Sequence, residues 1–350
     1  MPIVYPRPLV PGDVVGVTAP SAGVFPKLGT FLDGRLDRIR AAGFEVREGA
    51  ALRGKGLESA PRSTRLEDLR KMFADPSVRA IVPPWGGEKM IGLVPELDYA
   101  AYAEDPTWIV GYSDITNLTL PLTLLTGVAT VSGQNLMDPY VEPDGIADWL
   151  DVVQLPEDAS FTQRSPRAYR SGPWFDYVLD PSTTALTVDT EGGWVRLDDA
   201  AVPYASGGDA VDVTGRLIGG NLEITSVLAG TKFGDIPKFA EEHAGDDGLI
   251  VFVDHAEIST TQAYVALQAM RLAGWFDAAR AVLYSRARSK VVGGFTLHQA
   301  IQESIGDLGI PVFAEVECGH VPPHLTLVNG ALTRVTHDDH ASTVEQTLVP

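Results

Sequence analysis

Short apolar runs alternate with segments of helical spacing along the first 130 residues. The runs have the length of buried strands, and the segments between them place apolar residues on one helical face. The predicted strands are 14–19, 44–48, 80–82 and 108–110. The predicted helices are 32–42, 64–73 and 114–125. This alternation is typical of a parallel sheet covered by helices.

The regular pattern is lost from about 151 to 208, where prolines, aromatic residues and acidic residues mix without a clear period. We interpret this part as a connecting region with some strands. A second α/β pattern begins near Val213, where TGRLIGGNLEITSVLAGT predicts a strand, a Gly-Gly turn and a helix. Further strands are predicted at 249–255, 281–285 and 311–315, and helices at 260–273 and 296–305.

The composition is that of an ordinary globular protein with an acidic balance. The 350 residues carry a net charge of −19, which argues against nucleic acid or an anionic membrane as the main partner. The single cysteine, Cys318, excludes an intrachain disulfide and a Cys-rich zinc site. The sequence shows neither a signal-peptide pattern nor an apolar run of about 18 residues, so we expect a cytoplasmic protein.

A serine stands where the strand at 108–110 gives way to a helix, in the stretch WIVGYSDITN. A sharp strand-to-helix turn exposes a hydroxyl for nucleophilic attack, and the following N–H, on Asp114, lies where it can stabilise an oxyanion. The full G-x-S-x-G pattern is absent, because GYSDI lacks the second glycine. Ser113 or Asp114 as a simple helix cap is the alternative.

Paired glycines follow another predicted strand, in PPWGGEKM. Gly86 and Gly87 allow the backbone to approach a ligand and offer a second oxyanion donor. A plain tight turn is the alternative. The stretch lacks the full phosphate-loop pattern, so it does not indicate nucleotide binding there.

Carboxylates follow the apolar strand in LIVFVDHAEIST, with Asp254 the first candidate to orient a catalytic histidine and Glu257 the second. His255 is expected to face the other way because side chains alternate along a strand. A capping Asp and a surface Glu are the alternative interpretation.

His320 lies in the Gly- and Pro-rich loop of VECGHVPPHLTLVNGA, where a functional imidazole is often found, and His324 competes for the role. These histidines, with the residues around 254, do not predict a metal site, because two prolines separate His320 from His324. Cys318 lacks an oxyanion turn beside it. The chain order Ser113, Asp254, His320 matches one class of serine hydrolase.

These stretches, together with VGVTAPS and GRLIGGNLEI, occur in the order found in one peptidase family. From about residue 10 to 335 the chain resembles the LD-carboxypeptidase family, and within it the microcin-immunity (MccF-like) branch. The resemblance implies an α/β protein. An N-terminal parallel-sheet (flavodoxin-like) domain would cover 1–150, a connecting region 151–210, and a smaller C-terminal α/β domain 211–350, with the site at the junction. It also implies a homodimer with a Ser-Glu-His triad and without metal or cofactor.

Transferred to this chain, the resemblance places the nucleophile on Ser113, the base on His320, and the oxyanion donors near Gly87 and Asp114. The family's Glu-Asp pair after the strand is replaced here by Asp-His at 254–255. Asp254 is one methylene shorter than Glu but still able to orient an imidazole. Glu257 reaching back is the alternative acid.

The expected substrate is a small peptide or an aminoacyl-nucleotide. The MccF-like enzymes cleave the linkage of aminoacyl- or peptidyl-nucleotide toxins, and the LD-carboxypeptidases cleave murein tetrapeptide. Candidate substrate-binding residues are Gly86, Lys89, Trp174, Trp194, Arg216 and Arg286. Surface solvation of the cations and core packing of the tryptophans are the alternatives. A non-catalytic binding protein on the same fold and a flavin or nucleotide binder are the competing functions.

Overall fold

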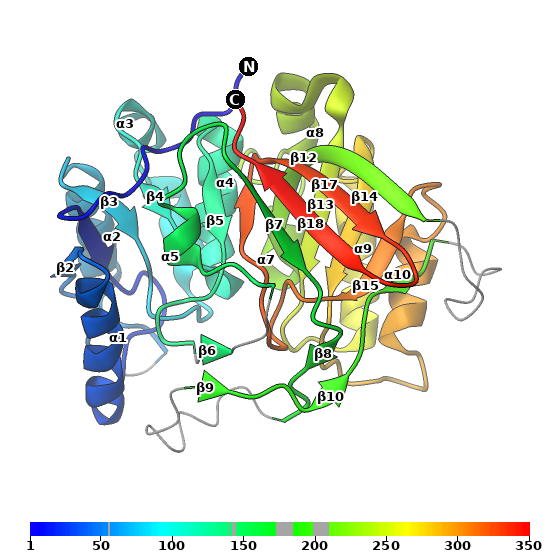
Figure 1. Cartoon of the computed structure of the whole chain (residues 1–350), viewed down its shortest axis with the longest axis horizontal. Helices are drawn as coiled ribbons and strands as arrows, with labels where there is room; N and C mark the ends of the chain where they lie inside the picture. Colours follow the sequence, from blue (N-terminus) through cyan, green and yellow to red (C-terminus); the bar gives the residue numbers. More distant parts are fainter. Residues whose placement is uncertain (55–56, 139, 142–144, 173–184, 199–209) are drawn as a thin grey trace.

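The computed structural model describes residues 1–350 except 55–56, 139, 142–144, 173–184 and 199–209. Two sheets lie side by side, and the two chain termini meet near the boundary between them (Figure 1). The strands that the hydrophobic pattern predicts are present in both sheets, within a few residues of the expected bounds.

The N-terminal sheet has four parallel strands in the order β2-β1-β3-β4. Its strands are β1 (Val14–Val17), β2 (Glu45–Glu48), β3 (Val78–Ile81) and β4 (Trp108–Ile109). The helices of this half are α1 (Gly29–Ala41), α2 (Arg62–Phe73), α3 (Tyr99–Glu104) and α4 (Thr116–Thr126). The short helices η1 (Pro26–Leu28), η2 (Met90–Glu96) and η3 (Ser113–Ile115) lie in the connections.

The C-terminal sheet is larger and mixed, with the order β11-β15-β14-β13-β12-β17-β18-β7. Its parallel centre consists of β12 (Val211–Asn221), β13 (Leu249–Asp254), β14 (Ala279–Ser285) and β15 (Val312–Val316). The antiparallel strands are β7 (Ser160–Arg164), β11 (Val195–Arg196), β17 (Leu332–His337) and β18 (Ser342–Thr347). The main helices are α7 (Leu222–Leu228), α8 (Ile236–Phe239), α9 (Thr260–Leu272) and α10 (Leu297–Ile305).

The segment interpreted as a connecting region supplies both outer strands of this sheet, because β7 pairs with β18 and β11 pairs with β15. The remaining elements are small. They are α5 (Trp149–Val152), the pair β6 (Tyr140–Val141) and β9 (Ala185–Leu186), the pair β8 (Ala168–Tyr169) and β10 (Thr190–Glu191), and the pair β5 (Thr130–Ser132) and β16 (Leu327–Asn329). The sheet of the C-terminal half therefore includes two strands, β7 and β11, that come before residue 211 in the chain.

The prediction of a Gly-Gly turn before α7 was wrong. Gly219 and Gly220 lie inside β12, which runs without a break to Asn221. A Cβ on Gly219 would lie 1.9 Å from the carbonyl oxygen of Phe252, and a Cβ on Gly220 would lie 2.4 Å from a methyl carbon of Thr116. The glycines are thus explained by close approach of neighbouring elements.

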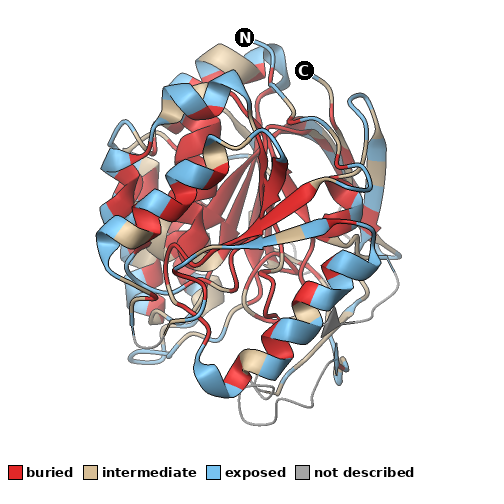
Figure 2. Ribbon diagram, turned by 90° about the vertical axis from the view of Figure 1, so that its left-hand side faces the viewer, coloured by how far each residue is buried: buried red, intermediate tan, exposed pale blue. Residues whose placement is uncertain are grey.

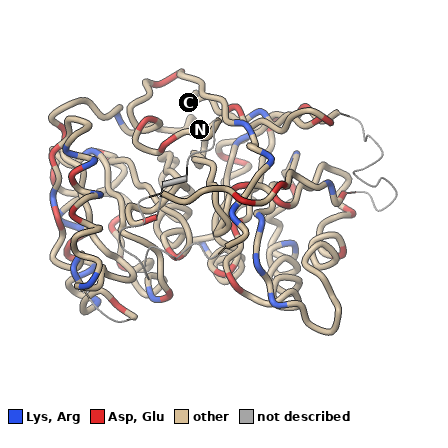
Figure 3. The backbone as a smooth tube through the Cα atoms, turned by 60° about the horizontal axis from the view of Figure 1, so that its bottom comes forward, with Lys and Arg blue, Asp and Glu red and all other residues tan. Residues whose placement is uncertain are grey.

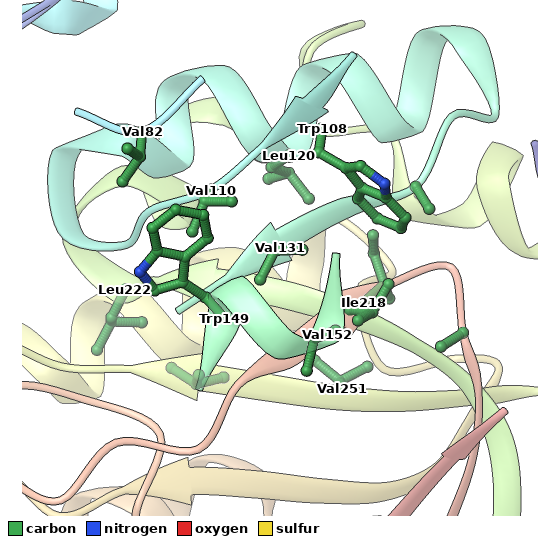
Figure 4. Packing of buried hydrophobic residues seen from close by; sticks show 14 of the residues in the cluster. Val82, Trp108, Val110, Leu120, Val131, Trp149, Val152, Ile218, Leu222 and Val251 are labelled. Carbon is green, nitrogen blue, oxygen red and sulfur yellow. The ribbon is translucent and has the colours of Figure 1, made fainter. Parts of the chain in front are cut away.

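One hydrophobic core joins the two halves. Trp108 and Trp149 from the N-terminal half pack in the same buried cluster as Ile218 and Val251 from the central strands of the C-terminal sheet (Figure 4). Buried residues are concentrated in the strands and on the inward faces of the helices (Figure 2). The two sheets therefore pack as one body, which fixes the residues at their boundary.

Charged residues of both signs lie along the outer helices and loops (Figure 3). Within the described ranges, every helix is too short or too polar to cross a membrane.

Candidate active site

Ser113 lies at a sharp turn between β4 and α4. Its φ is 64°, a left-handed conformation that is uncommon for a residue other than glycine. Such strain at a turn is often found at functional sites. The side chain does not cap the helix. It points instead toward His320, which comes from the other half of the chain.

A hydrogen-bonded chain connects Ser113, His320 and Asp254. The Ser113 Oγ lies 3.0 Å from His320 Nε2, and His320 Nδ1 lies 2.9 Å from Asp254 Oδ1. Asp254 ends β13, and His320 lies in the loop after β15, so both side chains emerge at the same edge of the parallel strands. The Asn221 amide donates to the second Asp254 oxygen at 3.2 Å.

Asp254 is buried and His320 is partly buried, with 1% and 11% of their side chains exposed. Burial alone would lower the pKa of His320, but the Asp254 carboxylate raises it above its ordinary value. Burial would likewise raise the pKa of Asp254, and the partnership with His320 holds it below the usual range. The pair therefore stabilises a protonated imidazole next to an ionised carboxylate.

Of the two candidate acids, Asp254 makes the hydrogen bond to the His320 ring. Glu257 is exposed at the edge of the same cleft, and its backbone N–H donates to Glu223 at 3.1 Å. His255 faces away from the pair, as the strand alternation predicts, and its Nδ1 pairs with the Tyr284 hydroxyl at 2.5 Å.

His324 and Cys318 lie behind this arrangement. Burial lowers the pKa of His324 to about 4, so its ring is neutral, and Nδ1 contacts the Leu325 carbonyl at 2.6 Å. Burial raises the pKa of the Cys318 thiol. The ring of Tyr112 packs against both histidines, with centroids 4.9 Å from His320 and 4.5 Å from His324.

Gly86 lies directly against the serine, since a Cβ there would be 2.8 Å from both Cβ and Oγ of Ser113. Gly87 has a φ of 149° and lines the cleft together with Asp114. The Asp114 carboxylate accepts hydrogen bonds from the Ser21 hydroxyl and from the Met90 N–H at 3.0 Å. Burial raises the pKa of this carboxyl. Asp114 therefore ties two loops to the turn that carries the serine.

Helix α4, which follows Ser113, is also fixed to the C-terminal sheet. The Thr116 hydroxyl of α4 accepts the N–H of Asn221 at 3.0 Å, and the missing side chain of Gly220 makes room for this approach. Asn221 thus contacts α4 through its backbone N–H and Asp254 through its side-chain amide.

Beside Ser113 the structure has a cleft of about 750 Å³. The N-terminal half contributes Phe25 and Trp85 to it, and the Trp85 indole donates to the Gly23 carbonyl at 3.2 Å. Asp138 also lines it, and burial raises the pKa of this carboxyl to about 7. Sequence reasoning did not select these three residues, although Trp85 lies within the stretch PPWGGEKM.

Several predicted substrate-binding residues have structural contacts instead. Trp194 is buried in the C-terminal core, where its indole donates to Glu317 at 2.7 Å, so the expectation that it stacks on substrate was wrong. Lys89 pairs with Glu58 on the surface. Trp174 lies outside the described residues.

The two arginines also have structural partners. Arg216 donates to the backbone carbonyls of Gly330, Val349 and Pro350. Arg286 donates to the Glu315 carboxylate at 3.0 Å. In the described ranges no three His, Cys, Asp or Glu side chains are grouped as metal ligands would be.

A serine hydroxyl, an imidazole and a buried carboxylate in this sequence of contacts form the arrangement that serine hydrolases use. Residues 15–133 match the family model of the LD-carboxypeptidase N-terminal domain, and residues 214–335 match that of the LD-carboxypeptidase C-terminal domain. The chain therefore belongs to the LD-carboxypeptidase family, whose members are serine peptidases.

Similar proteins lie in two functional groups of this family. The microcin C7 self-immunity protein MccF of Escherichia coli is 24% identical, with 97% of this chain and 96% of that protein covered. A Bacillus subtilis protein named "probable murein peptide carboxypeptidase" is 25% identical, with 97% and 94% covered. A solved structure of MccF in complex with glutamyl sulfamoyl guanosine has a TM-score of 0.78 at 21% identity, with 98% of both chains covered.

Proposed function

We propose that this protein is a serine carboxypeptidase or amidase of the MccF-like type, which hydrolyses the amide or acyl linkage of aminoacyl- or peptidyl-nucleotides. The observation that carries the proposal is the hydrogen-bonded chain from Ser113 through His320 to Asp254 at the wall of an open cleft. The role of base falls to His320, and that of orienting acid to Asp254.

In the proposed reaction, His320 Nε2 takes the proton of the Ser113 hydroxyl as the oxygen attacks the substrate carbonyl. The N–H groups of Gly87 and Asp114 stabilise the oxyanion. The imidazolium then protonates the leaving group, whose bond to the carbonyl carbon breaks. Water, deprotonated by His320, hydrolyses the acyl-enzyme and releases the serine.

The lining of the cleft supports a nucleotide as the leaving group. Phe25 and Trp85 place two aromatic rings on the N-terminal side, where a base can stack, and such stacking contributes about 1–3 kcal/mol per base. The volume of about 750 Å³ falls in the range of small-molecule sites.

Mass-detected hydrolysis tests the proposal. Purified protein is offered glutamyl sulfamoyl adenosine, lysyl sulfamoyl adenosine and a murein tetrapeptide, with Ser113→Ala as the control. Cleavage of a sulfamoyl adenosine that is lost in Ser113→Ala is the expected result. Cleavage of the tetrapeptide alone would make the protein a murein peptide carboxypeptidase. Turnover that persists in Ser113→Ala would refute the assignment. The assignment would also be refuted if the wild-type protein hydrolysed none of the three compounds.

A further inference from the structure

The C-terminal half gives the cleft a distinct side, which we call the acidic side and define as Glu223, Ile224, Glu257, Ile258 and Gln262. Two carboxylates, two branched apolar side chains and one amide come together there. Glu257 comes three residues after Asp254, and the same cleft is lined by Ser113 and His320, so the acidic side adjoins the triad.

The described lining of the cleft contains no lysine and no arginine. The ranges outside the described residues contain one cationic residue in sequence, Lys55. The cation at the cleft-forming loop of the N-terminal half, Lys89, is paired with Glu58. The negative charge of the acidic side is therefore not balanced by a lysine or arginine of the described lining.

Glu223 is held in place by the backbone. It lies in the first turn of α7, and its Oε1 accepts the N–H groups of Ala256 and Glu257, both at 3.1 Å. The half-buried carboxylate thus faces the loop that follows Asp254. Glu257 is exposed beside it.

We propose that the cleft selects an acyl residue whose side chain ends in a primary amine or a guanidinium. The carboxylates of Glu223 and Glu257 bind this cation, and Ile224 and Ile258 pack against the methylene groups that lead to it. This selectivity rests on the hydrolase function proposed for Ser113.

Electrostatics and packing both favour such a side chain. Hydrogen bonds between a cation and a carboxylate are about twice as strong as neutral ones, and two neighbouring carboxylates repel an acidic side chain. An aliphatic chain of three or four methylenes with a charged end keeps its stem on apolar surface and its head with polar partners. A neutral chain of equal length retains only the packing.

A series of aminoacyl sulfamoyl adenosines with lysyl, norleucyl and glutamyl groups tests the proposal, because lysine and norleucine have closely similar aliphatic chains. We expect kcat/KM for the lysyl compound to exceed that for the norleucyl compound by about tenfold. The glutamyl compound should be the poorest substrate. Equal values for lysyl and norleucyl, or a preference for glutamyl, would overturn the inference.

Binding to Ser113→Ala, measured by calorimetry, separates this inference from the proposed function. Tighter binding of the lysyl than of the norleucyl compound, without turnover by the wild type, would refute the hydrolase and keep the selectivity. Equal affinities would refute the selectivity whatever the turnover.

Glu257→Gln locates the effect, with Glu303→Gln on the exposed face of α10 as the matched control. Loss of the Glu257 charge should reduce the ratio of kcat/KM for the lysyl compound to that for the norleucyl compound to about threefold or less. The control should keep the full preference. An equal fall in kcat for all three compounds would instead make Glu257 part of the catalytic machinery and overturn its assigned role.

Discussion

Replacement of Gly86 by alanine should displace the nucleophile. The new Cβ would lie 2.8 Å from Ser113 Cβ and Oγ and 3.0 Å from the Asp114 nitrogen, whereas ordinary van der Waals contact begins at 3.4 Å. Ser113 Oγ is held by His320, so the serine must move by roughly 0.6 Å or more, or the glycine loop must retreat. A misplacement near 1 Å costs about 100-fold in rate, so we expect kcat/KM to fall by roughly that factor.

Steady-state hydrolysis of the preferred sulfamoyl adenosine measures this effect, with urea unfolding alongside to show that Gly86→Ala is folded. Gly92→Ala is the matched control, because Gly92 lies in η2 and a Cβ there meets no atom within 4 Å. The control should retain wild-type kcat/KM. Full activity of Gly86→Ala in a folded protein would refute the view that close packing against Gly86 positions the serine.

Three further predictions concern the carboxylates and the buried tryptophan. Asp254→Asn should lower kcat by about 10⁴-fold and move the acid limb of the pH–rate profile to lower pH, because the carboxylate raises the pKa of His320 above 6.5; an unmoved limb would contradict this. Asp138 has its pKa raised from 3.8 to about 7, so the folded protein holds a proton that the unfolded chain loses, and stability falls as pH rises from about 4 to 7. The stability of Asp138→Asn relative to wild type should therefore rise by about 3 kcal/mol between pH 4.5 and pH 8, measured by urea unfolding; an equal difference at both pH values would contradict this. Trp194→Phe should lower the free energy of unfolding by about 1–3 kcal/mol, because the buried Glu317 carboxylate loses the hydrogen bond from the indole, and it should leave KM unchanged. A raised KM would indicate that Trp194 contacts the substrate.

The strands and helices were predictable because their periods are local. The apolar run at Leu249–Asp254 and the helical spacing at Thr260–Leu272 appear in the structure at nearly the predicted bounds. The preference for Asp254 over His255 followed from the alternation along a strand, which needs no knowledge of the partner. The strand-to-helix turn at Ser113 was predictable for the same reason, because the apolar strand before it and the helical segment after it are both visible in the local sequence.

What failed depended on contacts between distant segments. Gly219 and Gly220 look like a turn in sequence, and only the approach of Phe252 and Thr116 explains them within a strand. A tryptophan in an irregular segment can be interpreted as a residue that stacks on substrate. The indole of Trp194 instead has a buried partner in Glu317, which is 123 residues away in the chain. No local pattern predicts either contact.

The candidate site exists only where the two halves meet. Ser113 lies in the N-terminal half, and Asp254 and His320 lie in the C-terminal half, so the 3.0 Å contact from serine to histidine depends on how the two halves pack. The contact of Thr116 with Asn221 fixes that packing next to the site, and Asn221 also holds Asp254. The continuous core and the close glycine approach at β12 therefore position the three polar side chains relative to one another.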